Sequence, residues 1–229
     1  MIEFRYVAPE EFAPEGAALM AAHITRAIDA RGACHLALSG GRAPWELFGV
    51  LARTDLDWAK VHVWQVDERV APDRDVDRNS VGLKTSLLAL APILASNVHL
   101  MDVTAPDLGE AAAAYASDLS RLCDGTLDLV HLGLGADGHT ASWPPGDPVV
   151  DIADRDVAIS KLYSGFVRMT LTVPCINRAR HRVFLITGGD KEHAIGELAA
   201  TGDIPAARVS ADGTDALIAL PQPLQHEPD

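Results

Sequence analysis

The residues best suited to chemistry lie in one run, Gly133-Leu134-Gly135-Ala136-Asp137-Gly138-His139-Thr140-Ala141-Ser142. Its glycines let the backbone fold closely around a ligand, and Gly138 is a candidate for such close contact. An imidazole titrates near neutral pH, so His139 is the natural general base of the run. Asp137 could fix the tautomer of that imidazole. A histidine on a loop is also often merely exposed, so both interpretations stay open at this point.

The same run satisfies the dinucleotide fingerprint G-x-G-x-x-G, with Asp154 and Asp156 at nearly the expected distance downstream. That fingerprint requires a helix that begins at its third glycine. Here Pro144-Pro145-Gly146 follows too soon to leave room for one. The pattern therefore favours a polar ligand loop over a nicotinamide site.

A second candidate site is Ser39-Gly40-Gly41, which follows an apolar run and precedes a helix with Pro44 in its first turn. Consecutive backbone N–H groups and the helix dipole would attract a phosphate there. A tight strand-to-helix turn explains the two glycines equally well. Arg42 adds a cation, which is either a phosphate partner or a solvated side chain.

Charged residues follow other predicted strands. Asp67-Glu68-Arg69 comes after the apolar segment 61–66, where a carboxylate could orient a sugar hydroxyl or an imidazole and Arg69 could meet developing negative charge. Three adjacent charges are more commonly an exposed salt-bridged turn. Arg168 begins a predicted strand and Lys191 opens a helix after Gly188-Gly189, so each is either a phosphate partner or a surface charge. The remaining histidines show no metal-ligand spacing, so we expect no metal.

Alternating strands and helices must position these loops. Apolar runs predict strands at 2–7, 34–38, 61–66, 98–100, 127–132, 157–162, 168–173, 182–187 and 216–220. Helical spacing predicts helices at 15–31, 44–53, 79–90, 108–122 and 192–200, with Gly32 ending the first and Asn79-Ser80 capping the third. This order predicts right-handed βαβ units in a three-layer α/β sandwich with a mostly parallel, Rossmann-like central sheet. Ligands bind beyond the carboxyl ends of such strands, where all the candidate loops fall.

Composition limits the class of protein. The 229 residues, 48% of them hydrophobic, suit one domain over residues 1–229. With 19 basic and 32 acidic residues the formal charge is −13, which argues against a nucleic-acid partner. Three distant cysteines fit a reducing cytoplasm, and neither a leader peptide nor a membrane-spanning run is visible. We therefore expect a cytoplasmic protein.

Five motifs in this order resemble the glucosamine-6-phosphate isomerase/6-phosphogluconolactonase family, and its lactonases in particular. They are Leu38-Ser39-Gly40-Gly41-x-x-Pro44, Asp67-Glu68-Arg69, the run from Gly133 to Ser142, Arg168-x-Thr170-Leu171-Thr172 and Gly188-x-x-Lys191. The resemblance covers nearly the whole chain. It implies a cofactor-free hydrolase of the pentose phosphate pathway that opens 6-phospho-D-glucono-1,5-lactone, on the fold of the sugar-phosphate isomerases and deaminases.

The resemblance also implies a role for each candidate residue. His139 would take a proton from the attacking water, Arg69 would stabilise the oxyanion, and Asp67 and Asp137 would orient reacting groups. Phosphate binding would fall to Ser39, Gly40, Gly41, Arg168 and Lys191, and further substrate contacts to Arg42, Glu68 and Gly138. We expect no cofactor, no membrane partner, and a monomer or weak homodimer.

Two other functions remain under consideration. An amino-sugar phosphate deaminase or isomerase of the same fold would carry a glutamate after the histidine, which Thr140-Ala141-Ser142-Trp143-Pro144 lacks. A sugar-phosphate sensor that regulates transcription would carry a DNA-binding module, and the first predicted strand already begins at Ile2. A non-catalytic sugar-phosphate binder is the harder alternative to separate from an enzyme.

Overall fold

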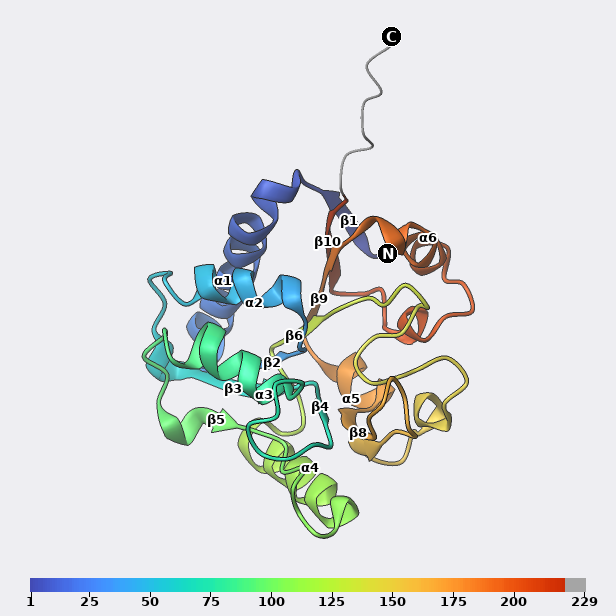
Figure 1. Cartoon of the computed structure of the whole chain (residues 1–229). Helices are drawn as coiled ribbons and strands as arrows, with labels where there is room; N and C mark the ends of the chain where they lie inside the picture. Colours follow the sequence, from blue (N-terminus) through green and yellow to red (C-terminus); the bar gives the residue numbers. More distant parts are fainter. Residues whose placement is uncertain (221–229) are drawn as a thin grey trace.

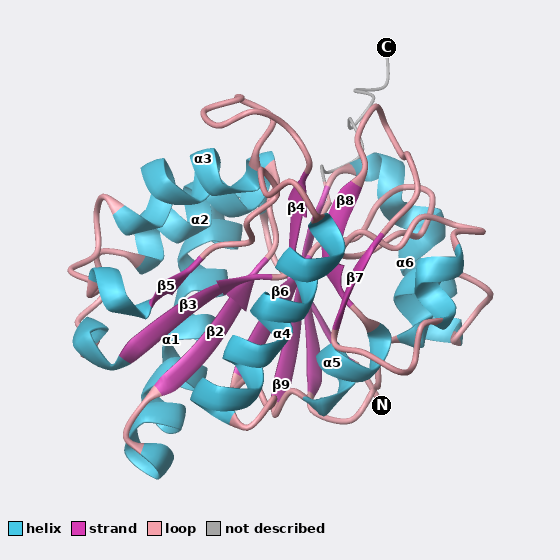
Figure 2. Ribbon diagram, turned by 90° about the horizontal axis from the view of Figure 1, so that it is seen from below, coloured by secondary structure: helices cyan, strands magenta, loops and turns pink. Residues whose placement is uncertain are grey.

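The computed structural model describes residues 1–220, apart from the side chain of Arg42. Its strands form two sheets (Figure 2). The central sheet has seven strands in the order β1-β10-β9-β6-β2-β3-β5, and all its pairings are parallel. Its strands are β1 (Glu3–Tyr6), β2 (Cys34–Leu38), β3 (Val61–Gln65), β5 (Val98–His99), β6 (Leu129–Leu132), β9 (His181–Thr187) and β10 (Thr214–Ala219). The predicted mostly parallel sheet is confirmed.

A second, smaller sheet is antiparallel and has the order β4-β8-β7. Its strands are β4 (Asp67–Arg69), β7 (Val157–Ile159) and β8 (Arg168–Leu171). The charged triplet 67–69 is therefore a strand and not the exposed loop that three adjacent charges suggested. Because Asp67 and Glu68 are buried, both need partners inside the protein.

Helices cover both faces of the central sheet. They are α1 (Phe12–Arg31), α2 (Arg42–Leu51), α3 (Asn79–Leu83), α4 (Leu108–Cys123), α5 (Val173–Arg178) and α6 (Glu192–Ala200). In Figure 1, α1, α2 and α3 lie on one side of the sheet, while α4, α5 and α6 lie on the other. This arrangement confirms the predicted α/β layers.

Strand β2 shows why its sequence is a run of apolar residues except for His35. Successive side chains point to opposite faces of a sheet, so Leu36 packs in the core beneath α1 and α2 while Ala37 packs in the core of the other face. All five residues of β2 are buried. A parallel sheet covered on both faces needs such a run, and the prediction for residues 34–38 was accurate for that reason.

Several predicted boundaries differ from the structure, and three of the differences have a clear origin. Helix α1 begins at Phe12 rather than at residue 15, because Pro14 is tolerated in a first helical turn. The predicted strand 168–173 ends at Leu171, and the short helix α5 begins at Val173 with a proline in its first turn. The predicted helix 79–90 consists of α3 followed by a π-helical turn over Lys84–Leu88.

The cap predicted for that helix was also wrong. The side chains of Asn79 and Ser80 do not cap it; instead, their backbone N–H groups donate to the carboxylate of Glu68 at 2.7 and 2.8 Å. A carboxylate satisfies such N-terminal donors well because they carry the positive end of the helix dipole. By contrast, Gly32 ends α1 as predicted, with a φ of 81°.

The strand order places a switch point between β2 and β6. From β2 the chain continues outward to β3 and β5, whereas from β6 it continues in the opposite direction to β9 and β10. The loops that follow β2 and β6 therefore diverge, which opens a crevice beyond their carboxyl ends. No helix within residues 1–220 combines the length and hydrophobicity of a membrane span.

Candidate active site

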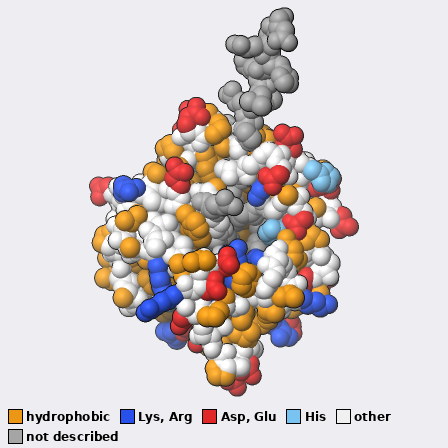
Figure 3. All heavy atoms as spheres, in the orientation of Figure 1, with side chains coloured by type: hydrophobic (Ala, Val, Ile, Leu, Met, Phe, Trp, Pro, Cys, Tyr) orange, Lys and Arg blue, Asp and Glu red, His pale blue; other side chains and the backbone are white. Residues whose placement is uncertain are grey.

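A cavity of about 700 Å³ lies at this switch point, beyond the carboxyl ends of the central strands. It is lined from the loop after β2, from β4, from the loop after β6, from β8 and from the loop after β9. Basic, acidic and histidine side chains meet near the middle of the face seen in Figure 3. The predicted site residues that line it are Ser39, Gly40, Gly41, Asp67, Arg69, His139, Arg168 and Lys191.

The general-base candidate His139 lies in this wall with Asp137 behind it. The Nδ1 atom of His139 is 2.6 Å from Asp137 Oδ1, and the backbone N–H of His139 donates to the same oxygen at 3.2 Å. In the neutral tautomer that donates Nδ1–H to this carboxylate, Nε2 is the ring nitrogen with the free lone pair. Burial alone would raise the pKa of Asp137, but hydrogen bonds from Tyr163 and His139 outweigh it and hold that pKa below its usual value.

The turn that presents His139 depends on glycine. Gly138 has a φ of +82°, and a Cβ atom at that position would lie 2.6 Å from the side chain of Ile204. The N–H of Gly135 donates to the carbonyl of His139 at 2.8 Å, which closes the turn. Gly138 does not line the cavity, so it shapes the loop, and its predicted substrate contact has no support in the geometry.

Two arginines face each other across the small sheet. Arg69 of β4 pairs with Arg168 of β8, and both line the cavity. Like charges directly opposite each other are unfavourable unless an anion lies between them or nearby. Arg168 is only 6% exposed, and its Nε atom has no partner within residues 1–220. This end of the cavity is therefore suited to an anionic ligand.

Asp67 supplies one compensating carboxylate. It accepts a hydrogen bond of 2.6 Å from the Ser142 hydroxyl. Burial raises the pKa of Asp67, although the Ser142 hydrogen bond and the charge of Arg168 oppose that effect. Burial likewise lowers the pKa of Arg168, opposed by Asp67. Asp67 thus lies where it can orient a ligand in the cavity.

The glycine loop and Lys191 also line the cavity. The hydroxyl of Ser39 donates to the carbonyl of His131 at 3.0 Å, so the loop can meet a ligand mainly through the backbone. Gly41 directly precedes the ten-residue helix α2, whose first turn presents N–H groups. Lys191 Nζ donates to the carbonyl of Leu134 in the cavity wall. The predicted phosphate residues thus all line one cavity, while the side chain of Arg42 lies outside the described part.

Glu68 does not line the cavity, although a substrate contact was predicted for it. It is fully buried and accepts hydrogen bonds from Gln65 Nε2 and from three backbone N–H groups, including that of Arg69. The guanidinium of Arg78 lies 3.3 Å from it. Its geometry is that of a structural carboxylate that holds Arg69 and α3 in place.

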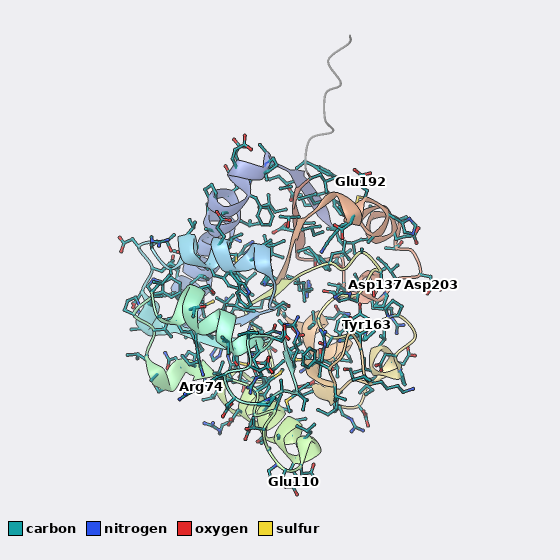
Figure 4. The ribbon with its side chains drawn as sticks, in the orientation of Figure 1. Arg74, Glu110, Asp137, Tyr163, Glu192 and Asp203 are labelled. Carbon is teal, nitrogen blue, oxygen red and sulfur yellow. The ribbon has the colours of Figure 1, made fainter. Side chains whose placement is uncertain are left out.

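Two residues that were not predicted as site residues belong to this site. Tyr163 donates its hydroxyl to Asp137 Oδ2 at 2.7 Å, and Figure 4 shows the two side chains beside each other. Asn79 lines the cavity and donates to the carbonyl of Asp67 at 2.9 Å. A turn signal, Ser164-Gly165, marks the hairpin that carries Tyr163, whereas the local signal at Asn79 predicted only a helix cap.

Within residues 1–220, no group of three or more histidine, cysteine, aspartate or glutamate side chains is arranged to hold a metal ion.

The protein-family model for glucosamine-6-phosphate isomerases/6-phosphogluconolactonase matches residues 8–218.

Individual relatives agree with this match. The 6-phosphogluconolactonase of Synechocystis sp. is 39% identical over 181 residues, covering 76% of this chain and 75% of the relative. That of Rhizobium meliloti is 37% identical and covers 80% of each chain. The crystal structure of 6-phosphogluconolactonase from Thermotoga maritima superposes with a TM-score of 0.89, covering 96% of this chain and all of the other. At 23% identity, that last likeness shows the fold.

Proposed function

The chain belongs to the glucosamine-6-phosphate isomerase/6-phosphogluconolactonase family, and we propose that it hydrolyses 6-phospho-D-glucono-1,5-lactone to 6-phospho-D-gluconate. This is the second step of the oxidative pentose phosphate pathway. The observation that carries the proposal is the His139–Asp137 pair in the wall of a cavity that also holds Arg69, Arg168 and Lys191. A general base and several cations are what hydrolysis of a phosphorylated ester requires.

Water is the nucleophile in this mechanism. Nε2 of His139 takes a proton from the water as the water attacks the lactone carbonyl, and Asp137 stabilises the imidazolium that forms. Negative charge develops on the carbonyl oxygen, and we assign its stabilisation to Arg69, a cation that lines the cavity. Asp67 orients the substrate from the same end of the cavity. When the ring oxygen leaves, the imidazolium returns the proton to it.

The phosphate is bound at a distance from the carbonyl. Backbone N–H groups around Gly40 and Gly41, together with Lys191 and Arg168, supply its hydrogen bonds. The chain carries a formal charge of −13, which disfavours long-range attraction of an anion. At physiological salt, charges are screened beyond about 8 Å, so these local cations determine binding.

Decay of freshly generated 6-phosphogluconolactone, corrected for spontaneous hydrolysis, tests the proposal. We expect the protein to accelerate decay equally with and without EDTA. His139→Gln should lower kcat by about 10²–10⁴-fold, the usual contribution of a general base. The matched control is His193→Gln, because His193 is an exposed histidine on α6.

Two other results of this assay would contradict parts of the proposal. Full kcat in His139→Gln would remove that residue as the base. No acceleration by the wild-type protein would refute the lactonase function, and turnover of glucosamine 6-phosphate and sugar-phosphate binding would then separate a deaminase from a non-catalytic binder.

A further inference from the structure

Tyr163 reaches the general-base pair from a separate part of the chain. It lies in the hairpin between β7 and β8, where Tyr163 and Phe166 exchange backbone hydrogen bonds of 2.9 and 3.1 Å. The two turn residues between them, Ser164 and Gly165, have φ values of 47° and 84°. Positive φ at both central positions is typical of the tight type I′ hairpin turn, which fixes the direction of the flanking side chains.

The hydroxyl of Tyr163 donates to the carboxylate oxygen of Asp137 that does not contact His139. It donates to Asp137 Oδ2 at 2.7 Å, while His139 Nδ1 lies at 2.6 Å from Oδ1. The same hydroxyl is 3.2 Å from His139 Nδ1. Because both carboxylate oxygens are engaged, Asp137 cannot rotate away from the imidazole.

A donor on one oxygen of a carboxylate draws negative charge toward itself. The oxygen that faces His139 then stabilises the imidazolium less than an unshared carboxylate would. The lowered pKa of Asp137 agrees with this withdrawal of charge: burial would raise that pKa, but hydrogen bonds from Tyr163 and His139 lower it. Burial, together with the hydrogen bond to Asp137, raises the pKa of Tyr163, so its hydroxyl stays protonated and able to donate.

We propose that Tyr163 is a positioning residue that acts through Asp137: it holds the His139 imidazole in its productive tautomer and weakens the stabilisation that the shared carboxylate gives to the imidazolium. This rests on the proposed lactonase function, which the inference deepens. Other charged groups line the cavity near His139, and all of them remain when Tyr163 is changed. They are Asp67, Arg69, Arg168, Asp190 and Lys191.

The first test is an NMR titration of the His139 imidazole in the ligand-free protein, assigned by its loss in His139→Gln. Tyr163→Phe keeps the ring over which the Arg168 guanidinium lies at 5.3 Å and removes only the hydroxyl. We expect the pKa of His139 to rise by roughly half a unit. Tyr6→Phe removes the hydroxyl of an exposed tyrosine on β1 and should leave that pKa unchanged.

A double-mutant cycle shows whether the effect passes through Asp137. In an Asp137→Asn background, Tyr163→Phe should no longer move the pKa of His139, because the carboxylate charge is absent. A shift that persists there would mean that Tyr163 acts directly on Nδ1, which overturns the proposal. An unchanged pKa in the single Tyr163→Phe variant would overturn it as well.

Kinetics supply the second readout. Lactone hydrolysis by Tyr163→Phe should lose about threefold in kcat/KM on the acidic limb of its pH profile, following a half-unit shift, and approach the wild-type value at high pH. A uniform loss at every pH, with the His139 pKa unmoved, would indicate a merely structural role. Since the titration needs no substrate, a failure of the lactonase function leaves its result interpretable.

Discussion

The side-chain oxygen of Asn79 occupies the space in which any other residue at position 40 would carry a Cβ atom. An ideal Cβ on Gly40 would lie 1.9 Å from Asn79 Oδ1 and 2.4 Å from its Cγ. Asn79 cannot easily move, because its amide donates to the carbonyl of Asp67 at 2.9 Å. Gly40 is therefore required by the packing of the cavity wall as well as by any ligand that binds the loop.

This contact predicts the effect of Gly40→Ala. Overpacking of this kind typically costs about 1–3 kcal/mol, and displacement of either Asn79 or the glycine loop disturbs the cavity. We expect kcat/KM to fall at least about tenfold, since small misplacements of binding groups are costly. Denaturant unfolding and lactone kinetics measure the two effects. Gly196→Ala on α6, where no atom lies within 4 Å of the new Cβ, should leave both quantities intact or slightly raise stability.

Lys191 should contribute to substrate binding, measured by KM, and not to the chemical step, measured by kcat. Lys191→Met keeps the aliphatic stem and removes the charge, and a charge-assisted hydrogen bond is worth about 1.5–3 kcal/mol. KM should therefore rise about 10- to 100-fold with kcat nearly retained. Lys60→Met, which removes an exposed lysine paired with Asp57, should change neither constant. An unchanged KM in Lys191→Met would remove Lys191 from the phosphate site.

Kinetics can distinguish two roles for Arg168, phosphate binding and oxyanion stabilisation, because this residue faces Arg69 across the small sheet. If Arg168 binds the phosphate, Arg168→Lys raises KM and leaves kcat largely intact. If it stabilises the oxyanion instead, kcat falls and KM changes little. We expect the first result. The second would assign both arginines to the carbonyl end of the cavity.

The sequence allowed much of this arrangement to be predicted, because the signals involved are local. Four of the five residues in the run 34–38 are apolar, with Gly32 shortly before it and Gly40 shortly after it, and Asp137 and His139 lie within one loop. The carboxyl ends of parallel strands meet by topology alone, which placed Ser39 and Lys191 in one cavity.

The parts that could not be predicted depend on pairing between distant segments. Strand β4 is recognisable only beside β8, about 100 residues later, where Asp67 pairs with Thr170. Glu68 resembled a solvated charge because its partners come from α3 and Arg78. Tyr163 joins Asp137 across 26 residues, and no periodicity links them.

The buried carboxylate of Glu68 predicts a stability effect without direct contact with substrate. In Glu68→Gln the charge that faces the buried Arg78 guanidinium is lost. Breaking a buried pair commonly costs about 3–5 kcal/mol, and because Arg78 keeps its ion pair with Asp73 we expect the lower end of that range and a clear fall in the denaturation midpoint. Asp151→Asn, which breaks the exposed pair with Arg208, should cost less than about 1 kcal/mol. Equal costs in the two variants would contradict the structural role of Glu68.

A final prediction concerns acid stability, because three histidines line up across neighbouring strands at the other end of the sheet. Trp64 donates to His35 Nδ1 at 3.1 Å, and His62 Nδ1 lies 3.2 Å from His99 Nε2. Burial lowers the pKa of His35 and of His99 to about 4, with the neighbouring His62 adding to the effect. Protonation of His35 at Nδ1 would also remove the acceptor that Trp64 uses.

The sign of the effect follows from these lowered values. The unfolded chain takes up protons near pH 6.5, whereas the native protein resists them until about pH 4. The stabilisation is therefore complete above about pH 6.5 and is lost as the pH falls toward 4. The denaturation midpoint should decrease over that window. His35→Gln should lower the midpoint at neutral pH yet flatten its dependence between pH 6.5 and 4, and an equally steep dependence in that variant would exclude His35 as a source of the acid sensitivity.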